Sequence, residues 1–150
     1  MPFFTRQVEP KSGGLIVVAL IGVSQARRSA LTAARQAIPN TVQVQALVDT
    51  GASSTCIDPS VLQQLSLTPT GTALVNTPTT GAQPAPAETY DVSLTIYAVA
   101  NQPALVQHTV PVLASDLFSA QGIHALIGRD ILRGCLLTYD GRSGLFSIAY

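Results

Sequence analysis

The chain has 150 residues, of which 47% are hydrophobic and 11% charged, and its eight basic residues balance its eight acidic ones. This length predicts one domain over residues 1–150, and the low charge excludes a basic surface for nucleic acid or anionic membranes. The two cysteines and two histidines lack metal-ligand spacing, so we expect no disulfide scaffold and no metal site.

Residues 1–40 are expected to form an N-terminal arm, a first strand and a short helical insertion. Residues 1–12 carry two prolines among mixed polar residues, which is typical of a loosely tied arm. Residues 15–24 are apolar and β-branched, and this predicts a buried strand. Good helix formers at residues 25–37, followed by Pro39, predict a helix before the next strand.

The apolar run of residues 15–23 has a second interpretation. Basic residues precede it and small polar residues follow it, which is the outline of a secretory signal. It is too short to span a bilayer, which requires about 20 apolar residues. The strand interpretation favours a cytoplasmic protein and makes membrane association unexpected, whereas a signal peptide at residues 1–26 would direct export.

Residues 41–150 are expected to form the core, with alternating apolar and polar positions that predict strands. The predicted strands and closing hairpin are residues 41–48, 91–97, 106–113 and 136–148. Short helical turns are expected after Asp58 and at residues 130–133. Thr, Pro, Gly and Ala dominate residues 68–88, which predicts a flexible hairpin with its tip near Gly81. The fold class is therefore mostly β, with one or two short helices.

The most informative segment is Ala46–Ser54, where an apolar run ends in Asp49 on a Thr-Gly turn. Burial of an ionised carboxylate without partners is costly, so an acid at the end of a buried strand suggests a function. Asp-Thr-Gly alone also suits an ordinary turn, because Asp bonds its own backbone and Gly accepts positive φ. Far downstream lies a second apolar run, Ala125–Leu132, which contains Gly-Arg-Asp.

Together the two segments resemble the retropepsin family, the retroviral-type aspartic proteases. The pattern hydrophobic-hydrophobic-Asp-Thr-Gly-Ala-Ser matches residues 47–53, and hydrophobic-hydrophobic-Gly-Arg-Asp followed by two apolar residues matches residues 126–132. The resemblance covers roughly residues 41–150. It implies a closed, barrel-like acid-protease fold with one half-site per chain. The low lysine content and absence of linkers suggest a bacterial or cellular member.

By this resemblance, Asp49, Thr50 and Gly51 would form half of the catalytic site of an aspartic endopeptidase that needs no cofactor. Two carboxyl groups that share one proton supply both a base and an acid, as the aspartic proteases themselves illustrate. The chain has one Asp-Thr-Gly, so a two-fold homodimer would place Asp49 opposite its own copy. The low net charge is compatible with such self-association.

The resemblance also implies residues that bind an extended polypeptide substrate. These substrate-binding residues are Ala52, Ser53, Thr79, Thr80, Gly81, Ala82, His124 and Leu126. Residues 77–87 would form a flap over the substrate, although the same segment also suits a long mobile loop.

Arg129 and Gly128 would have structural roles in this family. The matching arginine is an internal anchor that braces the loop after the Asp-Thr-Gly turn. Its partner here is open between Asp130, a backbone carbonyl and the neighbouring subunit. Arginine stays charged and cannot transfer protons, so catalysis by Arg129 is not expected.

Two alternatives to a protease remain open from the sequence. One is a dimeric peptide-binding or scaffolding module that keeps the fold without cleaving peptides. The other is a monomeric β-barrel in which Asp-Thr-Gly is only a turn.

Overall fold

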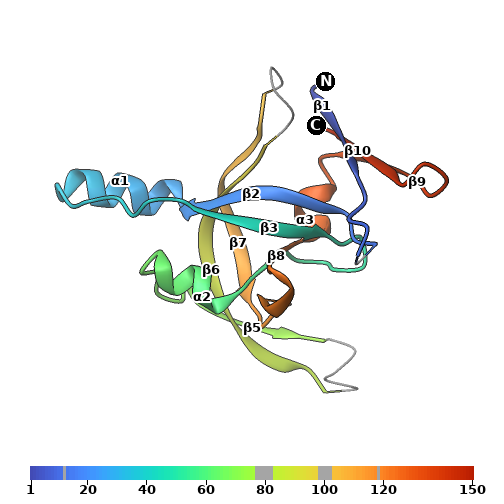
Figure 1. Cartoon of the computed structure of the whole chain (residues 1–150). Helices are drawn as coiled ribbons and strands as arrows, with labels where there is room; N and C mark the ends of the chain where they lie inside the picture. The colour runs from blue at the N-terminus through green and yellow to red at the C-terminus, as the bar shows by residue number, and fades with distance from the viewer. Residues whose placement is uncertain (12, 77–82, 98–102, 118) are drawn as a thin grey trace.

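Strands dominate the structure, a computed structural model that describes residues 1–11, 13–76, 83–97, 103–117 and 119–150 (Figure 1). The strands are β1 (Phe3–Gln7), β2 (Ile16–Val23), β3 (Val42–Val48), β4 (Cys56–Ile57), β5 (Gly71–Val75), β6 (Ala85–Ile96), β7 (Leu105–Ala114), β8 (Ile123–Ile127), β9 (Leu136–Asp140) and β10 (Leu145–Ala149). The helices in the described residues are α1 (Gln25–Ala33), α2 (Pro59–Gln64), α3 (Arg129–Leu132) and the 3₁₀ turn η1 (Ser119–Gln121).

Six strands close into a barrel in the order β2-β3-β8-β4-β7-β6. The ring closes because β2 pairs with β3 on one side and with β6 on the other, from Ala19 opposite Ile96 to Val23 opposite Val92. Because the ring is closed, each of these six strands pairs with a neighbouring strand on both sides. The predicted mostly β, closed barrel-like architecture is confirmed.

Alternation along the strands directs apolar side chains into the barrel. In β3, Val44, Ala46 and Val48 are buried while Gln43 and Gln45 are exposed. Full burial of a valine side chain stabilises the folded state by about 1.5–3 kcal/mol. The run that also resembled a secretory signal is strand β2, whose Ile21 has no exposed surface. The predicted strand is therefore present in the fold.

A second sheet, in the order β1-β10-β9, covers one end of the barrel. Its inner face contributes Phe4, Phe146 and Ile148 to the core, each 1% exposed. The prediction of a loose arm was wrong for residues 3–7, because β1 pairs with β10 along its whole length. This pairing brings the two chain termini together (Figure 1).

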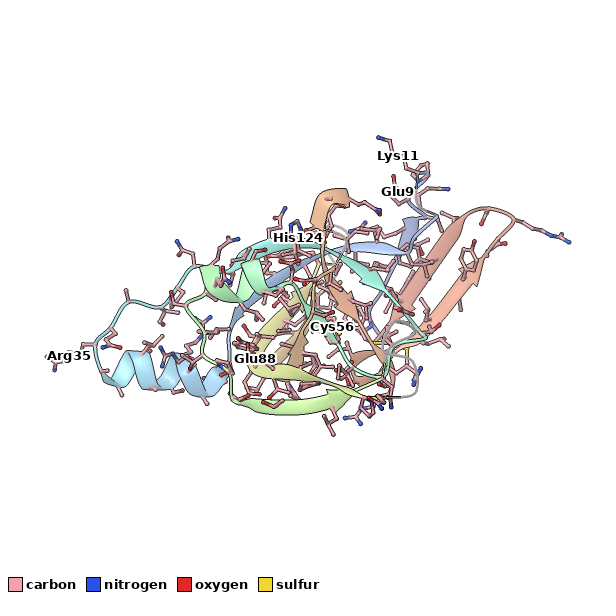
Figure 2. The ribbon with its side chains drawn as sticks, turned by 90° about the horizontal axis from the view of Figure 1, so that it is seen from below. Glu9, Lys11, Arg35, Cys56, Glu88 and His124 are labelled. Carbon is pink, nitrogen blue, oxygen red and sulfur yellow. The ribbon has the colours of Figure 1, made fainter. Side chains whose placement is uncertain are left out.

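The helix α1 projects from the barrel and is shorter than predicted (Figure 1). The Ser24 hydroxyl caps its first turn by accepting a hydrogen bond from the backbone N–H of Arg27 (3.3 Å). It ends well before Pro39, because Arg35 takes a left-handed conformation with φ of 54°. Figure 2 places Arg35 beyond the far end of the helix. No described helix is long and apolar enough to cross a membrane.

Candidate active site

The Asp49 turn, residues 49–54, leaves the barrel at the end of β3. Strand β3 runs parallel to β8, and the backbone N–H of Asp49 donates to the carbonyl of Ile127 (3.0 Å). The backbone N–H of Gly51 donates in turn to Oδ1 of Asp49 (2.7 Å). A Cβ on Gly51 would lie 3.0 Å from the same oxygen, so glycine permits this close approach. The half-buried carboxylate of Asp49 is thereby held in one orientation.

The guanidinium of Arg129 binds the backbone of the Asp49 turn. Its Nη1 donates to the carbonyls of Thr50 (2.8 Å) and Gly51 (3.0 Å). Of the three partners left open by the sequence, the structure therefore shows backbone carbonyls. A guanidinium offers several donors in a rigid plane, so one side chain can bind two consecutive carbonyls.

The first residues of α3 hold the rest of the turn through their backbone. The N–H of Arg129 donates to the carbonyl of Ala52 (3.0 Å), and the N–H of Asp130 donates to the carbonyl of Ser53 (3.2 Å). Gly128 precedes them, and a Cβ there would lie 2.6 Å from the carbonyl carbon of Ser54. Its φ of −90° is open to any residue, so the need for glycine is steric.

Asp130 forms a further contact that the sequence did not reveal. Its carboxylate accepts hydrogen bonds from the backbone N–H (2.9 Å) and hydroxyl (2.8 Å) of Thr55. The hydroxyl oxygen of Thr55 also accepts from the N–H of Gly128 (3.2 Å). Thr55 is fully buried, so these bonds satisfy polar groups that water does not reach. The Asp49 turn is thus fixed to α3 at both of its ends.

A cleft of about 490 Å³ opens beside the turn. Its lining residues are Asp49, Gly51, Ala52, Ser53, Ser54, Cys56, Val75, Asn76, Ala87, Leu113, Ala114, Ser115, Leu117 and Leu126. Asp49 is the only Asp, Glu, Lys or Arg among these described residues. Most of the walls are apolar or small, and they come from both strands of the β5–β6 hairpin as well as from β7 and β8.

The cleft contains some of the predicted substrate-binding residues. Ala52, Ser53 and Leu126 line it. Thr79, Thr80, Gly81 and Ala82 lie outside the described residues. The strands of the predicted hairpin are β5 and β6, which pair with Val75 opposite Ala85.

His124 is not among the described lining residues. It lies on β8 two residues before Leu126, and its carbonyl accepts from the backbone N–H of Asp58 (3.0 Å). Figure 2 shows His124 well separated from Cys56, which does line the cleft. Burial would raise the pKa of Asp58, but the hydroxyl and backbone N–H of Ser60, with His124 nearby, hold it below its usual value.

Cys56 brings a thiol into the cleft. Burial raises its pKa, and the negative charges of Asp130 and Asp49 raise it further. A thiol with a raised pKa stays protonated at neutral pH and is a poor nucleophile. Cys56 lies three residues beyond the matched motif, where no sequence signal indicates a thiol in the cleft.

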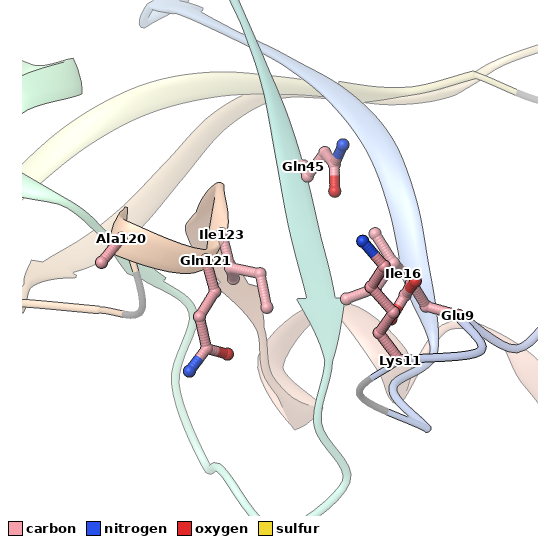
Figure 3. Close-up of a pocket in the computed structure, with 7 residues that line it drawn as sticks. All are labelled: Glu9, Lys11, Ile16, Gln45, Ala120, Gln121 and Ile123. Carbon is pink, nitrogen blue, oxygen red and sulfur yellow. The ribbon is translucent and has the colours of Figure 1, made fainter.

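A larger cavity of about 640 Å³ lies on another part of the surface. Figure 3 shows it beside β3, between Glu9, Lys11 and Ile16 on one side and Gln121 and Ile123 on the other. The Asp49 turn is not among the residues that line this cavity, so the smaller cleft is the candidate active site. Among the described residues, no three His, Cys, Asp or Glu side chains gather as metal ligands.

A sequence profile described as "Aspartyl protease" matches residues 35–131, which include the Asp49 turn and Gly128-Arg129-Asp130. The chain belongs to the aspartyl protease family. No curated protein matches this chain.

Solved structures similar to this chain include a retropepsin-like aspartic protease from Rickettsia conorii. The two chains are 15% identical, with a TM-score of 0.58 over 97% of this chain and 90% of that one. The EIAV protease complexed with the inhibitor HBY-793 is 17% identical, with a TM-score of 0.41 over 84% of this chain and 91% of that one. The Rickettsia structure supports the retropepsin-like fold.

Proposed function

We propose that this aspartyl protease is a homodimeric endopeptidase in which Asp49 of each subunit supplies one carboxyl of a catalytic pair. The observation that carries the proposal is a single oriented carboxylate at the edge of a cleft whose other described walls have no charged side chain. One carboxylate provides one proton-transfer group, whereas metal-free amide hydrolysis needs a base and an acid. A second copy related by a two-fold axis supplies the missing group.

The paired carboxyls would activate water between them. Two carboxyls at close range cannot both ionise, so one is ionised and the other protonated. The ionised Asp49 removes a proton from the water as its oxygen attacks the peptide carbonyl, and the protonated Asp49 donates to that carbonyl oxygen. The Asp49 that took the water proton then gives it to the amide nitrogen as the C–N bond breaks, and the other Asp49 takes back a proton from a hydroxyl of the intermediate, so that one carboxyl is again ionised and the other protonated. The two acids titrate as a unit, which predicts a bell-shaped pH profile of activity.

The substrate would be an extended polypeptide with apolar side chains beside the cleaved bond. Leu113, Leu117 and Leu126 offer apolar contacts, and Ala52 and Ser53 offer backbone groups to a bound strand. The tip of the β5–β6 hairpin, which carries Thr79 to Ala82, would close over the peptide as a flap.

Digestion of a peptide library tests this function, with wild type compared with Asp49→Asn. Wild type is expected to cleave between apolar residues, and Asp49→Asn is expected to lose at least about a thousandfold in kcat, because amide cannot replace the ionised member of the pair. Asp116→Asn, a change of the same type at an exposed acid outside the cleft, serves as the control and retains activity. Equal cleavage by wild type and Asp49→Asn would overturn the proposal.

Peptide binding by both proteins without any cleavage would instead support the non-cleaving module. A folded wild type that neither binds nor cleaves peptides would also contradict the protease. These outcomes are separated by measuring peptide binding by fluorescence anisotropy alongside the digestion.

A further inference from the structure

Another cavity, of about 290 Å³, lies on the outside of the barrel beside α1. It shares no lining residue with the cleft at the Asp49 turn. Residues of β2, β6, β7 and the start of α1 line it, and Figure 1 shows α1 leaving the barrel at the end of β2. Its polar lining residues are Gln25, Arg28, Thr41, Ser93, Thr95 and His108. We call this cavity the α1 pocket.

Gly22 accounts for the hollow in this face of the barrel. It lies opposite Ser93 in the pairing of β2 with β6. A Cβ at Gly22 would lie 2.8 Å from Oγ of Ser93 and 3.0 Å from Cγ2 of Thr41. The side chains of Ser93 and Thr41 therefore approach each other across a residue that has no side chain of its own. Thr95 lines the pocket from the same face of β6 as Ser93, because residues two apart in a strand share a face.

The charged and titratable groups of the α1 pocket are all basic. Among its described lining residues, Arg28 and His108 are the only members of the set Asp, Glu, Lys, Arg and His. Within the part of the chain that the structure describes, neither the Arg28 guanidinium nor the His108 ring has a hydrogen bond or ion pair. The nearest acid along β6 is Asp91, two residues before Ser93, and it does not line the pocket.

The sequence around α1 adds to this positive charge. Between Glu9 and Asp49 the chain has no acidic residue, whereas it has four basic ones, Lys11, Arg27, Arg28 and Arg35. The protein as a whole has no formal net charge, so the positive potential is local to this segment.

The donors of the α1 pocket suit an oxyanion. A guanidinium binds phosphate or carboxylate oxygens through two parallel hydrogen bonds, and such charge-assisted bonds are stronger than neutral ones. Hydroxyls of Thr41, Ser93 and Thr95 and the ring N–H of His108 add donors from other elements. Donors that come from several directions match the tetrahedral oxygens of phosphate better than the two coplanar oxygens of a carboxylate. The cavity has about the smallest volume usual for a small-molecule site, about 300 Å³.

We propose that the α1 pocket binds a phosphate group, either as the free ion or as part of a small phosphate monoester. Arg28 supplies the charge that attracts the group, and the hydroxyls of Ser93 and Thr95 donate to its oxygens. Leu20 and Val106 also line the pocket and offer apolar contact to the organic part of a monoester. Asp49 takes no part in this binding, so the site and the protease activity can be tested separately.

Isothermal titration calorimetry of the full chain with inorganic phosphate, at an ionic strength held constant with chloride, tests the pocket. We expect saturable binding by wild type, and a dissociation constant at least about tenfold higher for Arg28→Gln, because the charge-assisted bonds are lost. Arg27→Gln is the matched control. It removes the same charge from the neighbouring position of α1, which does not line the pocket, and it retains the wild-type constant. Acetate is expected to bind more weakly than phosphate.

The histidine ring signals in NMR spectra give a local readout of the same titration. The chain has two histidines, of which His108 lines the pocket and His124, on β8, does not. Phosphate should shift the ring signals of His108 and leave those of His124 in place, with His108→Gln used to assign them. No saturable binding of phosphate by wild type, equal weakening by Arg27→Gln and Arg28→Gln, or equal shifts of both histidines would overturn the proposal.

Phenyl phosphate distinguishes the two sources of the group. Tighter binding of phenyl phosphate than of inorganic phosphate would support a monoester whose organic part contacts Leu20 and Val106. Equal binding of the two would support free phosphate as the ligand of the α1 pocket.

Discussion

Gly128 shows how one residue controls the position of the Asp49 turn. It has an ordinary backbone conformation, yet the carbonyl group of Ser54 occupies the space that a side chain would need. The glycine therefore allows α3 to approach the turn closely enough for its backbone N–H groups to reach the carbonyls of Ala52 and Ser53. The Gly-Arg-Asp motif combines this close approach with the side-chain bonds of Arg129 and Asp130.

Gly128→Ala is expected to destabilise the protein by about 1–3 kcal/mol, because backbone atoms cannot move away from the added methyl as a flexible side chain would. Gly134→Ala is a matched control at the other end of α3, where the nearest atom to an added Cβ is the Ile131 carbonyl oxygen at 3.7 Å. Urea denaturation measures both variants. Equal stability of the two would show that the contact between Gly128 and Ser54 relaxes without cost.

At the scale of elements, Asp58 is the N-cap of α2. Its Oδ1 accepts from the backbone N–H (3.0 Å) and hydroxyl (2.6 Å) of Ser60, and Pro59 occupies the first helical position. The side chain is 6% exposed, so these bonds replace most of the water that would solvate the carboxylate. A six-residue helix depends strongly on such a cap.

Asp58→Ala is expected to cost about 1 kcal/mol of stability at pH 7. The folded pKa of Asp58 is lowered, so the contribution of its charge is complete above the unfolded pKa and is lost as pH falls through the folded pKa. The difference between wild type and variant should therefore shrink below about pH 4. Urea denaturation at pH 7 and pH 3 measures it, with Asp116→Ala as an exposed control. A difference that grows on acidification would contradict the assignment.

Local patterns predicted most strands and the centre of the site, and long-range pairing accounts for what they missed. Alternation located β3 and the middle of β6, and the motifs located Asp49, Arg129 and their neighbours. The pairing of β1 with β10 joins opposite ends of the chain, so no local pattern reveals it.

The contacts around the site were harder to predict for the same reason. The bonds between Thr55 and Asp130 join residues 75 positions apart in the sequence, so no local pattern indicates them. The position of His124 depended on how far β8 extends beyond the cleft, which alternation does not determine because His124 and Leu126 share one face. Spacing in the sequence therefore identified the motifs but not every wall of the cleft.

At the scale of the whole molecule, mixing subunits tests whether two chains make one site. When active and inactive subunits exchange at random, a tenfold excess of Asp49→Asn should reduce wild-type activity to about one tenth, because nearly every wild-type chain pairs with an inactive one. Substrate is kept far above the enzyme concentration, so that peptide binding by the variant does not lower the rate. A rate unaffected by excess Asp49→Asn would indicate a site complete within one chain.

The thiol in the cleft has a practical consequence for work on this protein. Because burial and two nearby carboxylates keep the Cys56 sulfur protonated, alkylating reagents should modify it slowly at neutral pH and faster in alkaline buffer. A peptide lying in the cleft would cover this sulfur. The rate of labelling at Cys56 can therefore report ligand occupancy even in a variant that no longer performs hydrolysis.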